Sequence, residues 1–144
     1  IYINHCRETI ELKRFQSARN AARWTDVTAV LSAIKVNQVD NGGPYVAAIT
    51  ALTADTKYMI GTAAAAPATC PNTNCTVITA GNCVDLTALT AGTPSYLARI
   101  PVSPKGVGTW SDSLTGYYLS KKGSGSITVG ACDAENNETI AVER

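Results

Sequence analysis

The five cysteines and the single histidine are the side chains of this chain best suited to metal, redox or nucleophilic chemistry. None of the cysteines forms a Cys-x-x-Cys pair, and a zinc site needs four closely spaced ligands, so the pattern disfavours zinc. Disulfide bonds made in an oxidising compartment are the better interpretation, with Cys6 left free or paired between chains. The cysteines are Cys6, Cys70, Cys75, Cys83 and Cys132.

Residues for acid–base or nucleophilic catalysis are scarce. A Ser-His-Asp or Cys-His mechanism would have to use His5, which lies in a stretch expected to be mobile. Paired carboxylates would have to come from Asp112, Asp133 and Glu135, but such residues more often cap turns and cover strand ends. The acidic residues are also too scattered for a calcium loop. The sequence therefore predicts a protein that is not an enzyme and has no cofactor or metal site.

Composition favours one small domain of the secreted, self-packing type. The 144 residues are enough for one modest core, and an apolar share of 45% suits a folded globule. Only 16% of the residues are charged, which leaves much of the surface to Thr, Ser, Asn, Gly and Ala. A net charge of +1 gives no general attraction to nucleic acid or anionic lipid. No run reaches the roughly 18 apolar residues of a membrane span, and no signal peptide is visible.

A long helix is predicted from about residue 7 to residue 38, because this stretch contains no Gly or Pro. It should stop at the sequence Asp-Asn-Gly-Gly-Pro of residues 40–44. Such a helix spans about 45 Å, so its first half should project from the domain, be packed by something else, or fray. One face, at helical spacing, should pack on the domain: Trp24, Val27, Val30, Leu31 and Ile34.

A second stripe of the same helix is smooth and small, which suits close packing against other helices. The plain alternative is that its alanines only reflect helix propensity. The stripe consists of Phe15, Ala18, Ala22, Ala29 and Ala33.

The rest of the chain predicts short strands and loops. We expect strands at residues 57–60, 115–120, 126–132 and 139–142, with a hairpin loop at 121–125. We expect short helical turns at residues 45–53 and 84–88 and a cross-linked loop at 63–81. The predicted fold class is α+β: a long N-terminal helix packed by its C-terminal half on an antiparallel sheet of three to four strands.

Several stretches resemble type IV pilins and the related pseudopilins. The sequence FQSARNAAR resembles the point where the pilin helix leaves its membrane-spanning half, and residues 24–40 resemble the segment packed on the sheet. The sequences IPVSPKG, TGYYL and ITVGACDAE resemble a family loop and the two strands that follow it. The four cysteines from Cys70 onward are similar to those of a group of bacterial pilin-like proteins. The resemblance covers about residues 15–135.

The first fourteen residues depart from the family pattern. The family begins with Phe, a Glu five residues in and a long apolar run, whereas residues 1–14 are polar and charged. Residues 9–12 resemble that start, but the charged residues Lys13 and Arg14 follow at once. Glu11 is therefore not assigned the family's assembly role. We expect residues 1–14 to be an atypical leader of foreign origin, and residues 15–144 to form a pilin-like domain.

The resemblance implies a structural role. Subunits of this family stack helix against helix into surface filaments for adhesion, motility, secretion or DNA uptake. They are inserted in the inner membrane before assembly, and their partners are copies of themselves or other pilins. A minor pseudopilin of a secretion or competence machine is the nearest alternative.

Two binding functions remain as further alternatives. A secreted glycan- or protein-binding module would use Trp110, Tyr117 and Tyr118. DNA binding would use the basic residues at the front of the helix, but these spread over more than half of its circumference, as on a solvated helix. They are Lys13, Arg14, Arg19 and Arg23.

Two disulfides are expected, and we predict the pairs Cys70–Cys75 and Cys83–Cys132. The first would close a local loop, and the second would join the loop region to the last long strand. The other two pairings of four cysteines remain open.

Two triplets, Asn74-Cys75-Thr76 and Asn137-Glu138-Thr139, match the N-glycosylation sequon. Such triplets are common by chance in a chain rich in Asn and Thr. A disulfide at Cys75 further weakens the first.

Overall fold

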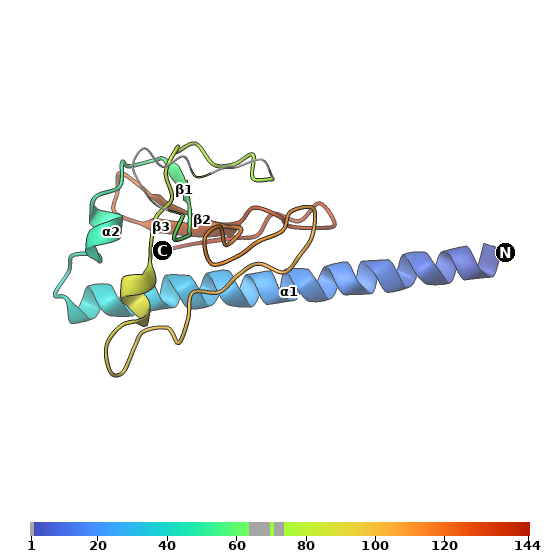
Figure 1. The fold of residues 1–144 in the computed structure, drawn as a ribbon, viewed down its shortest axis with the longest axis horizontal. Coiled ribbons are helices and arrows are strands. Elements are labelled where there is room, and N and C mark those ends of the chain that lie inside the picture. Colours follow the sequence, from blue (N-terminus) through green and yellow to red (C-terminus); the bar gives the residue numbers. More distant parts are fainter. Residues whose placement is uncertain (1, 64–69, 71–73) are drawn as a thin grey trace.

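The molecule consists of a long helix and a head that packs on the C-terminal half of this helix (Figure 1). The computed structural model describes residues 2–63, 70 and 74–144. Helix α1 spans Tyr2–Asp40 and helix α2 spans Ala47–Thr50, with a 3-10 helix η1 at Thr87–Thr90. The strands are β1 Lys57–Met59, β2 Tyr117–Lys121, β3 Ile127–Ala131 and β4 Ala141–Glu143.

The sheet has four antiparallel strands in the order β1-β2-β3-β4. Strands β2 and β3 form the predicted hairpin, in which Leu119 lies opposite Val129, and β4 adds at the edge of β3. Strand β1, far away in the sequence, pairs with the other side of β2. The predicted α+β class and antiparallel sheet are therefore confirmed, with four strands.

Helix α1 ends where the sequence predicts, because two glycines there accept a left-handed turn. Gly42 has φ +76° and its N–H donates to the Val39 carbonyl at 3.0 Å. The Gly43 N–H donates to the Gln38 carbonyl at 3.0 Å. This pair of bonds is the Schellman arrangement, which satisfies the last carbonyls of the helix.

The main core lies between the C-terminal half of α1 and the sheet. From the helix it contains Val27, Val30, Leu31 and Ile34, each at most 3% exposed. They pack with apolar residues of the strands and of the segment before β4, namely Leu119, Ile127, Val129 and Ile140.

Two helix residues lie elsewhere than the sequence predicts. Trp24, expected in the core, is 38% exposed, since at this level of the helix the head covers only the side with Asn20 and Arg23. Ala33, expected on the stripe that packs against other helices, is 5% exposed and belongs to the core cluster of the head. The other four stripe residues, Phe15, Ala18, Ala22 and Ala29, are exposed.

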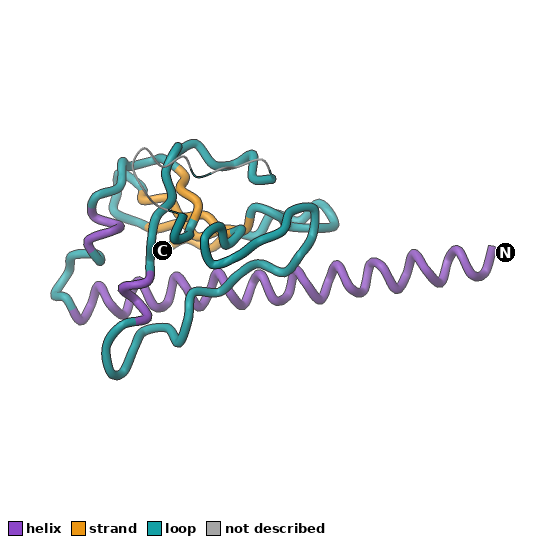
Figure 2. The backbone as a smooth tube through the Cα atoms, in the orientation of Figure 1, coloured by secondary structure: helices purple, strands orange, loops and turns teal. Residues whose placement is uncertain are grey.

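The N-terminal half of α1 extends beyond the head, as the purple tube in Figure 2 shows. Its larger apolar side chains are open to solvent: Ile10, Leu12 and Phe15 are 53%, 56% and 62% exposed. No helix among the described residues combines the length and the apolar character needed to cross a membrane.

The cysteine pairs differ from the predicted ones. The disulfides are Cys70–Cys83 and Cys75–Cys132, with Cα–Cα distances of 5.2 and 4.9 Å. The Val84 N–H donates to the Met59 carbonyl at 2.8 Å, which places Cys83 beside β1. Cys132 follows β3 instead, so the predicted pairing was wrong because Val84 joins the first strand.

A second, smaller core surrounds these bridges. It contains Cys70, Cys75 and Ile78, together with Met59 and Tyr118 of the sheet. In the chain-entropy model, closing loops of 13 and 57 residues contributes about 3 and about 4 kcal/mol. The two disulfides indicate an oxidising, extracytoplasmic compartment.

Other local predictions were close. Residues 45–53 contain α2, whereas the turn expected at 84–88 begins later, as η1, because Val84 forms a bridge with Ile60. Much of the predicted loop 63–81, namely residues 64–69 and 71–73, lies outside the described residues.

Replacing Leu31 with Ala should lower the free energy of unfolding by about 2–5 kcal/mol, because this 3%-exposed side chain would leave a cavity. Val39→Ala is the matched control: Val39 is 76% exposed, so its truncation should change stability by less than about 0.5 kcal/mol. Urea unfolding measures both. A Leu31→Ala variant as stable as the wild type would contradict this packing.

Replacing Cys70 with Ser should free the thiol of Cys83 and leave the Cys75–Cys132 bridge intact. Alkylation without reduction, followed by tandem mass spectrometry, identifies the labelled residue. The reciprocal variant Cys75→Ser should expose Cys132. Labelling of Cys75 in the Cys70→Ser protein would support the pairing that the structure excludes.

Candidate functional site

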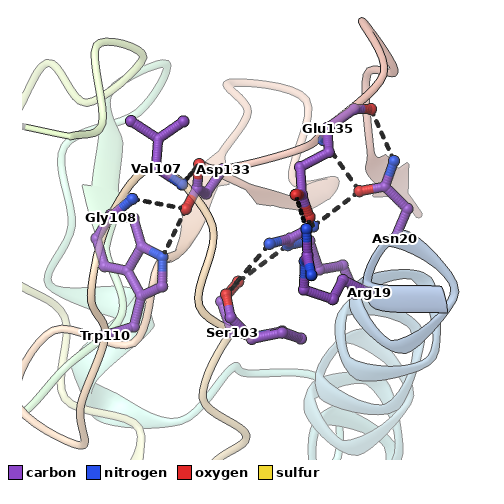
Figure 3. Close-up of polar contacts among 10 residues, drawn as sticks. Arg19, Asn20, Ser103, Val107, Gly108, Trp110, Asp133 and Glu135 are labelled. Carbon is purple, nitrogen blue, oxygen red and sulfur yellow. Dashed lines mark hydrogen bonds and ion pairs between the residues drawn. The ribbon is translucent and has the colours of Figure 1, made fainter. Parts of the chain in front are cut away.

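A cluster of charged and polar groups joins α1 to the head at the point where the helix begins to project. It consists of Arg19, Asn20 and Arg23 of the helix, Ser103 of a long loop, and Glu135 in the turn after β3 (Figure 3). We call these five residues the charged clamp.

Both arginines of the clamp bind the same carboxylate. Arg19 Nε and Nη2 donate to the two oxygens of Glu135 at 2.8 and 2.5 Å. Arg23 Nη1 donates to Glu135 Oε2 at 2.6 Å. The fork of Arg19 against the carboxylate fixes orientation as well as distance, which a single contact would not.

Arg23 is the most constrained residue of the clamp, with a side chain that is 0% exposed. Besides Glu135 it donates to Asn20 Oδ1 at 2.8 Å, Ser103 Oγ at 3.1 Å and the Pro104 carbonyl at 3.1 Å. A buried guanidinium is tolerated only when its charge is paired and its donors are satisfied. The surrounding loops are therefore held around this side chain.

Asn20 adds a backbone connection between the helix and the turn after β3. Its Nδ2 donates to the Glu135 carbonyl at 2.7 Å, and its Oδ1 accepts the Glu135 N–H at 3.0 Å (Figure 3). The side chain thus pairs with Glu135 much as a neighbouring strand would. The helix is attached to the head through both the backbone and the side chain of one residue.

The arginines stabilise the charged form of Glu135. Hydrogen bonds from Arg19, supported by Arg23, lower the Glu135 pKa from 4.5 to about 2, against the opposing effect of burial. The same contact with Glu135 raises the pKa of Arg19. The clamp therefore stays fully charged at every ordinary pH.

Asp133, next to the clamp, folds the loop that leads back to the sheet. Its carboxylate accepts the N–H groups of Val107 and Gly108 at 3.2 and 2.9 Å, and Trp110 Nε1 at 3.1 Å (Figure 3). The indole lies on Gly116, where φ is +79° and a Cβ would meet the ring at 2.6 Å. Glycine at position 116 is thus required both by the turn and by the ring.

The aromatic residues proposed for glycan binding are used inside the molecule. Tyr117 and Tyr118 are 1% and 6% exposed, and Tyr117 donates its hydroxyl proton to Asp26 Oδ2 at 2.5 Å. Burial and this hydrogen bond raise the pKa of Tyr117, and burial raises the pKa of Asp26. Trp110 is half-buried against Asp133. The aromatic surface expected from the sequence is therefore not formed, because all three residues support the fold.

The other candidate residues do not converge on one site. Arg19 and Arg23 bind Glu135, which removes them from a DNA-binding set and leaves Lys13 and Arg14 exposed on the projecting helix. Asp112 is an exposed loop residue, apart from the clamp. The side chains of His5 and Cys6 lie outside the described residues. Among the described residues, no group of three or more His, Cys, Asp or Glu side chains is arranged to hold a metal ion.

Sequence reasoning missed the clamp, although one signal for it was present. Arg23 precedes Val27 and Val30 by four and seven residues, so it occupies the face of the helix that packs on the head. A charge on such a face requires a buried partner. What the sequence could not show is that the partner lies at Glu135, more than a hundred residues later.

Replacing Glu135 with Gln should destabilise the head by about 3–5 kcal/mol at neutral pH, because Arg23 would keep a buried charge without its counter-ion. A carboxyl whose pKa is lowered by folding contributes stability above its ordinary pKa of 4.5 and loses it as the pH falls to about 2. The difference between variant and wild type should therefore shrink across this interval. Urea unfolding at a series of pH values measures it.

Glu138→Gln is the matched control, since it makes the same change three residues later at an exposed position. It should alter stability by less than about 0.5 kcal/mol at neutral pH. Equal effects of the two substitutions, or a Glu135→Gln effect that does not change between pH 4.5 and 2, would refute the clamp.

In comparisons with known proteins, no protein-family model, no curated protein and no solved structure matches this chain. The resemblance drawn from the sequence has its support in the fold. A long N-terminal helix packed on a four-stranded antiparallel sheet, with two disulfides in the head, is pilin-like in shape.

Proposed function

We propose that the protein is a structural, non-enzymatic subunit of a type IV pilus-like filament, assembled outside the cytoplasm from copies of itself or related subunits. The observation that supports this most directly is the helix α1, which extends beyond the head with its apolar residues uncovered. A monomer gains nothing from this exposure, whereas neighbouring helices in a filament would bury it.

The exposed side of α1 has the spacing of a helix-packing seam. One row of residues, at positions 15, 22, 29 and 36, repeats every seven residues. A second row, at positions 18, 25, 32 and 39, lies three residues further along, as the two core positions do in a coiled coil. We call this surface the seam; it consists of Phe15, Ala18, Ala22, Thr25, Ala29, Ser32, Val36 and Val39. Its residues are exposed or half-buried, and small side chains dominate its middle.

The seam lies opposite the core-facing side of the helix, and residues 94–97 of the head border it at Ala29, Ser32 and Val36. Residues of the core-facing side, such as Asn20, Val27 and Ile34, lie two positions from the nearest seam residues, a rotation of about 200°, and therefore point the other way. Around Phe15, Ala18 and Ala22, which are exposed, helix-to-helix packing therefore need not displace the head. Even Thr25 suits this role, because its hydroxyl donates to the Ala21 carbonyl of its own helix at 3.1 Å.

A filament subunit must also transmit force between its helix and its head. The charged clamp and the core around Leu31 fix the helix to the sheet, and the Cys75–Cys132 disulfide ties the loop region to the end of strand β3. Adhesion, motility, secretion and DNA uptake are all uses for such a subunit.

An Ala18→Glu substitution should abolish filaments, because it places a charge on the seam where helices would pack. Ser17→Glu is the matched control: it adds the same charge at an exposed neighbouring residue rotated by about 100° from the seam. The measurement is the amount of protein in filaments sheared from cells that produce each variant, with immuno-electron microscopy of the wild type.

Continuous labelling along fibres, lost in Ala18→Glu and kept in Ser17→Glu, is the expected result. Sparse labelling would favour the minor pseudopilin instead. Wild-type protein found only as secreted monomers, or equal filament yields from both variants, would overturn the proposal.

A further inference from the structure

The turn between β3 and β4 contains an exposed asparagine, Asn137. Asn136 and Asn137 adopt consecutive left-handed conformations, with φ 56° and 57°, which Asn tolerates better than most residues. Every residue from Asn136 to Thr139 is exposed. Within the described part of the chain, the side chains of Asn137 and Thr139 make no hydrogen bond. Their sequence, Asn137-Glu138-Thr139, is a complete acceptor triplet for N-linked glycosylation.

The two acceptor triplets of the chain differ in accessibility. In Asn74-Cys75-Thr76 the middle residue is 0% exposed and bonded to Cys132, so the triplet cannot leave the head without breaking a disulfide. In the second triplet the middle residue, Glu138, is exposed, and its N–H makes one bond, to the Glu135 carbonyl at 3.1 Å. An enzyme that must draw the acceptor into its own site can therefore reach Asn137.

A groove next to Asn137 offers room for the attached sugar. It runs between the helix and the loop at residues 105–107, and it is lined by Gln16 and Lys105 together with Asn136 and Asn137. Val107, at 85% exposed, lies on the same groove. Amide and ammonium donors suit sugar hydroxyls, and an apolar side chain suits the C–H face of a sugar ring.

We propose that Asn137 is an N-glycosylation site whose glycan covers this groove and shelters Val107. In the reaction the Asn137 amide nitrogen bonds to the anomeric carbon of an activated sugar, the bond from that carbon to a diphosphate breaks, and the amide loses one proton. The donor is a diphosphate-linked sugar, carried either by a lipid or by a nucleotide. This inference uses the exposed turn and the oxidising compartment, and it does not rest on the proposed filament.

Intact mass of the protein isolated from its native cells tests the proposal, followed by mapping of the modified peptide. The expected mass exceeds that of the polypeptide by whole sugar residues, all of them on Asn137. A single sugar would indicate a nucleotide-linked donor, and an oligosaccharide would indicate a lipid-linked one.

Thr139→Ala should remove the added mass and Thr139→Ser should keep it, because the hydroxyl at this exposed position is the required element. Asn74→Gln should leave it unchanged. An unmodified Asn137 in the native protein, or a glycan that persists in Thr139→Ala, would overturn the proposal. Filament formation is scored separately, so its outcome does not affect this one.

Discussion

The burial of one positive charge organises this molecule. Arg23 lies on the face of α1 that packs against the head, and its 0% exposure means that water cannot solvate its guanidinium group. The surrounding chain must replace that water with hydrogen-bond acceptors of the right geometry. Glu135, Asn20, Ser103 and the Pro104 carbonyl do so, and they come from the helix, the long loop and the turn after β3. One residue therefore determines where three distant segments meet.

Two hydrophobic cores complete the fold and serve different purposes. The larger core, around Leu31 and Val129, packs the helix on the sheet. The smaller one, around Cys75 and Tyr118, contains few large apolar side chains and includes the cysteines of both disulfides. Disulfides suit this second region because they restrict the unfolded chain without requiring a large buried surface. The head thus gains stability by two routes in a chain of modest size.

The helix has one side that packs on the head and an opposite side that we propose packs against neighbouring subunits. Its core-facing side has large apolar residues and the buried Arg23, and its opposite side is the seam, in which small side chains dominate the middle. Because the two sides point away from each other, the intramolecular packing and the proposed intermolecular packing do not compete around Phe15, Ala18 and Ala22, where the seam is clear of the head. The groove beside Asn137 lies next to the projecting half of the helix, where a glycan would reach the edge of the seam without covering the core.

Local rules were enough for the elements of this fold but not for their partners. The helix stop follows from Gly42 and Gly43, because left-handed φ values are inexpensive for glycine, and the β2–β3 hairpin follows from alternating side chains. Trp24 was misplaced because the sequence does not show how far the head extends along the helix. Trp110 was misplaced because its hydrogen-bond acceptor, Asp133, lies 23 residues later in the chain.

What the sequence by itself determined is the α+β class, the long helix with its apolar face and its stop, the strands of the sheet and the use of cysteines in disulfides. These depend on propensity and periodicity within a few residues. Only the tertiary structure decided that Cys70 pairs with Cys83, that Arg23 pairs with Glu135, and that Asn137 stands open while Cys75 is locked. Each of these depends on which segments distant in the chain become neighbours, and that is set by the joint packing of helix and sheet.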